Sequence, residues 1–186
     1  MRLIAFEGPD RVGKTTQVAL VTQKLKSSGH RIQDYKIPWK DDSVTYDLIY
    51  SFLFSDKVRS YPMTFQAAQM ENRLKFQEQV LDQIRADLVL VDRWSLSSQV
   101  YGAAQGIKSS FYESDLKQPD LTVIFDGQPF FKEDQDTLEM DWKLQTKVRS
   151  LYEAVSGDKV AHIQANRPQS EVTETILGLI LVTLKG

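Results

Sequence analysis

The sequence predicts a three-layer α/β fold in which helices flank a five-stranded, mostly parallel sheet. Segments with strand character alternate with segments of helical periodicity, which is the pattern of strands joined by crossover helices. Residues 88–91 are all apolar, as expected for a strand buried on both faces of a parallel sheet. The 186 residues, 41% of them hydrophobic, suffice for one domain, 1–186, with a substantial core.

The first half of the chain is expected to contain two strands and three helices. Residues 3–6 form a short apolar strand, and a glycine-bearing turn leads into a helix over 14–27 with apolar residues at helical spacing. Residues 31–37 are a weaker strand, and 44–54 are a helix that follows a loop. A long helix is expected over 64–86, because its apolar residues recur every four positions.

The second half opens with the buried strand, residues 87–91, which ends at Asp92. A polar segment, about 127–138, is expected to form a short lid. Two further strands and two further helices complete the pattern, at 121–126, 138–155, 159–163 and 171–184.

Composition excludes several kinds of site and partner. The chain has no cysteine, so it forms no disulfide, thiolate metal site or cysteine nucleophile. A net charge of −2 and the lack of a basic region argue against a nucleic-acid polymer as partner. The longest apolar stretch, 176–184, is too short to span a bilayer, and residues 1–7 are too short an apolar run for a signal peptide. We therefore expect no membrane partner and a cytoplasmic location.

A phosphate-binding loop is the strongest functional signal. Between the first strand and the first helix, one segment matches G-x-x-x-x-G-K-[ST] at every fixed position: Gly8-Pro9-Asp10-Arg11-Val12-Gly13-Lys14-Thr15. Main-chain N–H groups of such a loop surround the phosphates of a nucleoside triphosphate, Lys14 reaches the β- and γ-phosphates, and Thr15 offers its hydroxyl to Mg²⁺. These residues and Thr16 are predicted to bind the nucleotide. Asp92 is predicted to hold the same metal ion, unless it is an ordinary strand-end carboxylate.

Two classes of phosphate-loop protein compete, a switch-type GTPase and a kinase for small metabolites. A GTPase needs D-x-x-G downstream of the loop and N-K-x-D for guanine. The only Asp-x-x-Gly lies inside the loop itself, and no Asn-Lys-x-Asp occurs. The sequence therefore favours the kinase.

Further motifs resemble those of the thymidylate kinases. The segment 6–17, FEGPDRVGKTTQ, resembles that family's F-E-G-x-D-x-x-G-K-[ST]-T-Q, and the segment 92–101, DRWSLSSQVY, is similar to its D-R-[YH]-x-x-S-x-x-A-Y. Three shorter matches occur in the family's order, at Ile37-Pro38, Asn72-Arg73 and Pro119-Asp120-Leu121-Thr122.

The resemblance implies a catalytic set of Asp10, Arg11, Lys14 and Arg93. Asp10 would lie near the acceptor's 3′-hydroxyl and the metal, and Arg11 would stabilise charge on the transferring phosphoryl group. No arginine occurs between Arg93 and Arg149, so the lid cannot supply that charge in place of Arg11. Arg93 would hold the acceptor's 5′-phosphate, with a structural ion pair as the alternative.

The resemblance also implies a set of acceptor-binding residues. Lys40 stands where the family often has another phosphate-binding arginine, although a solvated loop lysine fits its position equally. Tyr101 would exclude a ribose 2′-hydroxyl, unless it is one more half-buried helix aromatic. The base or the phosphate would be contacted by Arg73, Gln69, Ser97 and Ser98. Glu7 would approach the acceptor or the metal.

Two features depart from the family. Gln69 stands where an aromatic ring usually stacks on the thymine, and a glutamine stacks poorly. Phe65, Trp39 and Trp94 are the rings that could compensate. The lid is short and has Lys132 as its only basic residue, which predicts loose closure and some hydrolysis of ATP.

The expected reaction is therefore ATP + dTMP giving ADP + dTDP, with Mg²⁺ and with relaxed base specificity. The resemblance further implies a homodimer. The alternatives are a kinase for another deoxynucleotide or for a deoxynucleoside, and a phosphate-loop protein that binds nucleotide without turnover.

Overall fold

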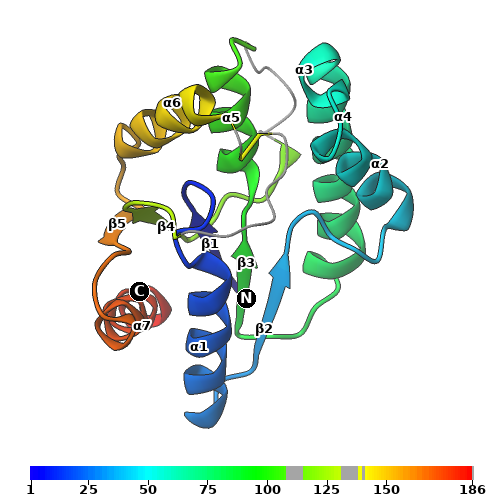
Figure 1. Ribbon diagram of the computed structural model, residues 1–186. Coiled ribbons are helices and arrows are strands. Elements are labelled where there is room, and N and C mark those ends of the chain that lie inside the picture. Colours follow the sequence, from blue (N-terminus) through cyan, green and yellow to red (C-terminus); the bar gives the residue numbers. More distant parts are fainter. Residues whose placement is uncertain (108–114, 131–137, 140, 186) are drawn as a thin grey trace.

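The computed structural model describes residues 1–107, 115–130, 138–139 and 141–185. Its five strands form one sheet in the order β2-β3-β1-β4-β5, and every neighbouring pair is parallel (Figure 1). The strands are β1 (Arg2–Glu7), β2 (Ile32–Lys36), β3 (Leu88–Asp92), β4 (Leu121–Asp126) and β5 (Val160–Gln164). The prediction of a five-stranded parallel sheet is confirmed. Because β1 is central, the loop that follows it lies beside the carboxyl ends of both neighbouring strands.

Helices cover both faces of this sheet (Figure 1). One face is covered by α1 (Lys14–Ser27) and α7 (Gln169–Lys185), which pack together over the strands. The other face is covered by α4 (Pro62–Phe76), α5 (Ser95–Ala104) and α6 (Trp142–Glu153), with α2 (Ser43–Leu53) packed on α4. The three-layer arrangement predicted from the sequence is thus confirmed.

The central strand supplies both halves of the core, because successive side chains of a strand point to opposite faces. Ile4 and Phe6 are fully buried beneath α1 and α7. Leu3 and Ala5 are buried in the opposite layer, against Phe76 and the other residues of that cluster. No helix in the described part of the chain is both long enough and apolar enough to cross a membrane.

The predicted long helix is shorter than expected. The α-helix ends at Phe76, a π-helical segment η1 (Gln77–Leu81) follows, and the chain is no longer helical at Ile84. Val80 and Ile84 still pack against the core cluster of Phe76, and the Ile84 N–H donates to the Val80 carbonyl at 2.9 Å. The apolar residues spaced four apart therefore still reach the core, although the last of them lies beyond a turn that leads the chain toward β3.

The helix predicted over 138–155 also begins late, at Trp142. Asp141 caps it by accepting a hydrogen bond from the Leu144 N–H at 3.1 Å, so Glu139 lies before the helix. The sequence pattern did not predict α3 (Lys57–Ser60) and set no bounds for α5, although Tyr101 was considered as a helix residue. Of the predicted lid, residues 131–137 and with them Lys132 lie outside the described residues.

Candidate active site

The phosphate loop joins β1 to α1 and depends on glycine at two positions. Gly8 has φ +137°, and a Cβ there would lie 2.8 Å from the Phe125 carbonyl oxygen of β4. Gly13 has φ +87° immediately before α1 begins. Side chains at these positions would be strained, and at Gly8 a side chain would also clash. The glycines thus let the loop lie against β4 with the N-terminus of α1 facing the site.

Lys14 is folded back onto its own loop. Its side chain is 5% exposed and its amine donates to the carbonyls of Gly8, at 3.2 Å, and Pro9. Burial disfavours the ammonium form and nearby Arg93 repels it, so the pKa of Lys14 falls to about 8. These carbonyl contacts hold the amine next to the loop that would surround the phosphates.

This pKa predicts a pH limit on nucleotide capture. A lysine must be charged to bind phosphate, so kcat/KM for ATP should fall as pH rises through about 8. kcat should hold to higher pH, because bound phosphates favour the ammonium form of Lys14. Steady-state rates from pH 6 to about 10 measure both profiles. A kcat/KM profile that stays flat across this range would contradict the prediction.

Thr15 and Asp92 meet at the start of α1. The Thr15 hydroxyl donates to the Asp92 carboxylate, which is 3% exposed at the end of β3. Hydroxyl and carboxylate oxygens are hard ligands, and Mg²⁺ bound with nucleotide takes one or two protein ligands, water and phosphate oxygens. These two residues therefore fit the metal predicted from the sequence. Among the described residues, no cluster of three or more histidine or carboxylate side chains offers another metal site.

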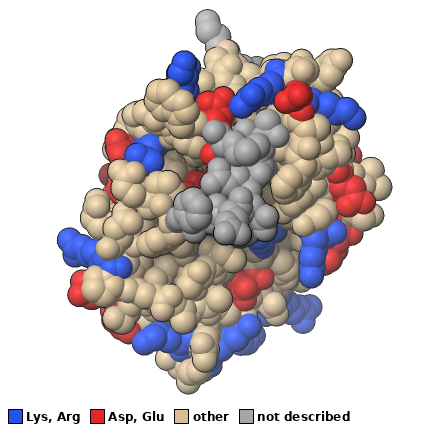
Figure 2. Space-filling model, viewed as in Figure 1, with Lys and Arg blue, Asp and Glu red and all other residues tan. Residues whose placement is uncertain are grey.

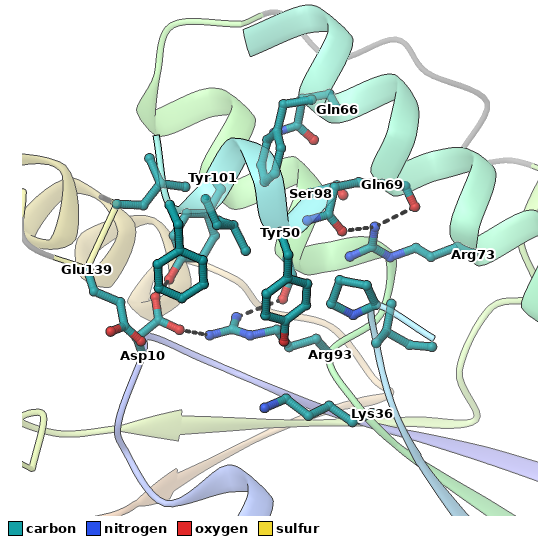
Figure 3. Close-up of a pocket in the computed structure, with 17 residues that line it drawn as sticks. Asp10, Lys36, Tyr50, Gln66, Gln69, Arg73, Arg93, Ser98, Tyr101 and Glu139 are labelled. Carbon is teal, nitrogen blue, oxygen red and sulfur yellow. Dashed lines mark hydrogen bonds and ion pairs between the residues drawn. The ribbon is translucent and has the colours of Figure 1, made fainter. Parts of the chain in front are cut away.

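A cavity of about 310 Å³ opens beside the loop, at the carboxyl ends of β1, β2 and β3 (Figure 3). Seven of the eight predicted acceptor residues line it, namely Asp10, Gln69, Arg73, Arg93, Ser97, Ser98 and Tyr101. Lys40, on the loop before α2, does not line the cavity. This volume of about 310 Å³ lies at the lower end of the range for small-ligand pockets, roughly 300–1,000 Å³.

Arg93 lies on the floor of the cavity and is held from several sides (Figure 3). Its guanidinium donates to the Asp10 carboxylate, to the Ser97 hydroxyl at 3.1 Å and to the Gly8 carbonyl at 3.3 Å. The guanidinium carbon also lies 5.5 Å from the Tyr101 ring centre. Burial favours the neutral form of Asp10, but Arg93 and Lys14 outweigh it and lower the pKa of that carboxyl. The arginine and the carboxylate are thus a fixed ion pair between the loop and the cavity.

Gln69 and Arg73, one turn apart on α4, form the opposite end of the cavity (Figure 3). The Arg73 guanidinium donates to the side-chain oxygen of Gln69 at 2.9 Å and to the Trp94 carbonyl at 3.1 Å. The Gln69 amide oxygen is therefore occupied. Among the described residues, the buried Ser98 Oγ of the cavity wall has no hydrogen-bond partner. A ligand in the cavity is the natural partner for that hydroxyl, because buried polar groups are almost always hydrogen-bonded.

Arg11 occupies a different place from the other predicted catalytic residues. It has φ +64°, and its guanidinium donates to the Glu139 carboxylate at 2.8 Å. It lines a second cavity of about 240 Å³, between the phosphate loop and α6, and not the acceptor cavity. Asp10 and Glu139 line both cavities.

With this geometry described, comparison with known proteins decides the family. The sequence profile of the family described as thymidylate kinase matches residues 6–176.

The chain belongs to the thymidylate kinase family.

Similar proteins are found in distant organisms. The chain is 27% identical to a probable thymidylate kinase of Archaeoglobus fulgidus, over 96% of this chain and 94% of that protein. It is 26% identical to a thymidylate kinase of Arabidopsis thaliana, over 98% of this chain and 72% of that protein. A solved thymidylate kinase of Candida albicans has the same fold, with a TM-score of 0.74 at 19% identity, over 97% of this chain and 91% of that one.

In this thymidylate kinase family member, Glu7 lies behind the cavity. It is fully buried and does not line the cavity. Its carboxylate accepts hydrogen bonds from the N–H groups of Trp94, at 2.7 Å, and Ser97, at 3.3 Å, and so caps the first turn of α5. Burial raises the pKa of Glu7 despite these hydrogen bonds. The structure therefore places Glu7 as a support for α5, and not beside the acceptor as the resemblance implied.

Several of the residues that line the cavity of this thymidylate kinase family member were not identified from the sequence. They are Lys36, Tyr50, Phe54 and Gln66. Of the rings expected to compensate for Gln69, only Phe65 lines the cavity, whereas Trp39 and Trp94 pack edge-on against Phe76 in the core. Tyr50 and Phe54 lie four residues apart on α2 and just past its end, a spacing that was a usable signal for one shared face.

Proposed function

We propose that this protein transfers the γ-phosphoryl group of ATP to dTMP, giving ADP and dTDP. The observation that carries the proposal is the junction of two sites: a loop of main-chain amides shaped for a triphosphate, and a cavity that holds Arg93 beside it. The Arg93–Asp10 pair stands between them. An acceptor phosphate bound at Arg93 would thus face the terminal phosphate of a nucleotide bound in the loop.

The reaction needs positioning and charge stabilisation, and no covalent enzyme intermediate. An oxygen of the acceptor's 5′-phosphate attacks the γ-phosphorus, the bond from that phosphorus to the β-phosphate oxygen breaks, and ADP leaves with the electron pair. Lys14 holds the β- and γ-phosphates, Arg93 orients the acceptor, and Arg11 neutralises charge on the transferring group. For this last role Arg11 has to exchange Glu139 for the phosphoryl group, because the two are paired at 2.8 Å.

Mg²⁺ would be held by Thr15 and Asp92, and when bound it supplies positive charge to the phosphate oxygens. The support for this assignment is the hydrogen bond between the two side chains at the mouth of the loop. We also propose a homodimer in the cytoplasm. The resemblance to the family supports both. Exposed apolar residues on α2, Val44 and Leu48, and at the start of α4, Tyr61 and Met63, are apolar area that a second subunit would cover.

The base end of the cavity supports relaxed base specificity. Gln69 replaces the stacking ring and is tied to Arg73, so recognition falls to polar groups and to the rings of α2 and Phe65. Loss of base–aromatic stacking costs about 1–3 kcal/mol. The thymine methyl group adds only about 1–3 kcal/mol of discrimination. Broad substrate specificity is described for the Candida albicans enzyme that shares this fold.

An acceptor panel tests this function. With saturating ATP, we expect the highest kcat/KM with dTMP, a rate with dUMP within about 100-fold of it, and slow ADP formation when no acceptor is present. The rates are measured with dTMP, dUMP, dCMP, dGMP, dAMP and thymidine. Preference for a purine would contradict the pyrimidine assignment, preference for thymidine would indicate a nucleoside kinase, and no turnover with any acceptor would indicate a non-catalytic nucleotide-binding protein.

A further inference from the structure

We propose that Lys36, the last residue of β2, binds the 5′-phosphate of the acceptor together with Arg93. The inference deepens the proposed function, on which it rests, by assigning a phosphate-binding residue that the sequence motifs did not indicate. Lys36 lines the acceptor cavity, whereas Lys40, at the position implied by the resemblance, does not.

The charges of the cavity point to Lys36. Its lining contains the cations Lys36, Arg73 and Arg93, with the carboxylates Asp10 and Glu139. Arg93 is paired with Asp10, and Arg73 donates to a side-chain and a main-chain oxygen. Within the described ranges, Lys36 has neither a hydrogen bond nor an ion pair. An entering phosphate dianion therefore finds Arg93 already paired with a carboxylate and Arg73 held at the far end of the cavity by neutral oxygens. Lys36, exposed at the end of β2, has by contrast an amine that no group in the described part of the chain holds.

The position of Lys36 in the sheet places it at the phosphate end of the cavity. It is the register partner of Asp92, so the two side chains emerge on the same face of the sheet. Asp92 contacts Thr15 on that face, and Arg93 follows Asp92 directly. Figure 3 shows Lys36 on the side of Arg93 and Asp10, away from Gln66, Gln69 and Arg73 at the other end. The amine thus lies where the acceptor phosphate would meet the phosphate loop.

The structure also explains why Lys40 is excluded. Both main-chain groups of Trp39 are bonded to the Asn72 side chain, the N–H at 2.7 Å and the carbonyl at 3.0 Å. Trp39 is itself 8% exposed and packs against Phe76. This anchoring buries residue 39 and leaves the next side chain on the surface.

Binding of dTMP and thymidine to the full-length protein distinguishes a phosphate contact from a change in cavity shape. Calorimetry measures the affinity of each variant for dTMP. Lys36→Met should lower this affinity about 10- to 100-fold, the size expected for one lost hydrogen bond to a charged group. Thymidine, which lacks the phosphate, should bind Lys36→Met and wild type equally. Lys36→Arg should restore most of the dTMP affinity. Lys26→Met, on the exposed last turn of α1, is the control for loss of a surface charge.

Three results would overturn the inference. They are dTMP affinity unchanged in Lys36→Met, equal weakening of dTMP and thymidine, and a loss in Lys40→Met with none in Lys36→Met. Turnover of the wild type is measured in parallel. If the wild type phosphorylates dTMP but Lys36→Met binds it normally, only the role of Lys36 fails. If the wild type turns over no acceptor but Lys36→Met selectively loses dTMP binding, the proposed reaction fails and the phosphate contact stands.

Discussion

Replacing Arg11 by glycine is expected to lower kcat about 10³-fold or more, the usual value of an arginine that neutralises a transferring phosphoryl group. That factor corresponds to about 4 kcal/mol of transition-state stabilisation. KM for both substrates should change much less, because the contribution of Arg11 is made in the transition state. Single-turnover phosphoryl transfer with ATP and dTMP measures the chemical step directly.

The backbone of Arg11 makes glycine the informative replacement. At φ +64° a non-glycine residue is strained by about 1–2 kcal/mol, which glycine relieves. The salt bridge to Glu139, with 12% and 20% of the two side chains exposed, is about as buried as the Arg93–Asp10 pair, so its loss should cost about 2 kcal/mol. The lost salt bridge and the relieved strain largely offset each other, so the midpoint of thermal unfolding should change little and lost activity cannot be attributed to lost folding. Arg31→Gln removes another arginine–carboxylate pair, at 2.6 Å, far from the loop, and should keep wild-type kcat. A kcat for Arg11→Gly within tenfold of wild type would assign the charge stabilisation elsewhere.

Replacing Arg93 by methionine is expected to lower kcat/KM for dTMP about 10³-fold or more, because a bidentate phosphate contact and the orientation of the acceptor are lost together. kcat/KM for ATP at saturating dTMP should fall less. Arg93→Lys keeps the positive charge but loses the two parallel N–H donors of the guanidinium, so it should recover only part of the activity. Initial rates over both substrate concentrations measure these effects.

The same change should destabilise the fold through Asp10. Removing one partner of a buried ion pair costs about 3–5 kcal/mol. With 17% of Arg93 and 23% of Asp10 exposed, we expect about 2 kcal/mol. Without Arg93, burial of Asp10 is less opposed and its pKa should rise, so the added instability should diminish as pH falls.

A double variant separates the two roles of Arg93. Adding Asp10→Asn to Arg93→Met removes the uncompensated charge and should restore much of the unfolding free energy without restoring activity. Urea unfolding and kinetics on the same samples test this. Because Asp10 is itself in the predicted catalytic set, activity is compared with that of Asp10→Asn alone. If Arg93→Met cost no further activity in that background, Arg93 would be a structural partner of Asp10 and not an acceptor ligand.

The layered fold was predictable because its signals are local. The buried run before Asp92, the glycines of the phosphate loop and the apolar periodicity of α1 each act over a few residues. The predicted helix boundaries were wrong where tertiary packing, and not local sequence preference, set an end of the helix. The apolar spacing through Ile84 continued past the end of the helix, and Asp141 rather than Leu138 set the start of α6.

In the candidate site, too, local patterns identified some residues and only the tertiary packing identified the others. The loop residues Gly8 to Thr15, Asp92 and Arg93 were found because they adjoin one another in short motifs, and Gln69 and Arg73 because they lie one helical turn apart. No pattern within a motif could indicate that Lys36 lines the cavity while Lys40 does not, or that Glu7 caps α5.

By itself, then, the sequence determined the α/β layering, the phosphate loop and the family, because short-range spacing encodes each of them. Only the tertiary structure decided which lysine reaches the acceptor cavity and which partner holds each arginine. Those outcomes depend on the strand order β2-β3-β1, which sets Lys36 beside Asp92, and on Asn72, which fixes the loop at Trp39. Contacts between segments so far apart follow from the packing of the whole chain, and no local preference specifies them.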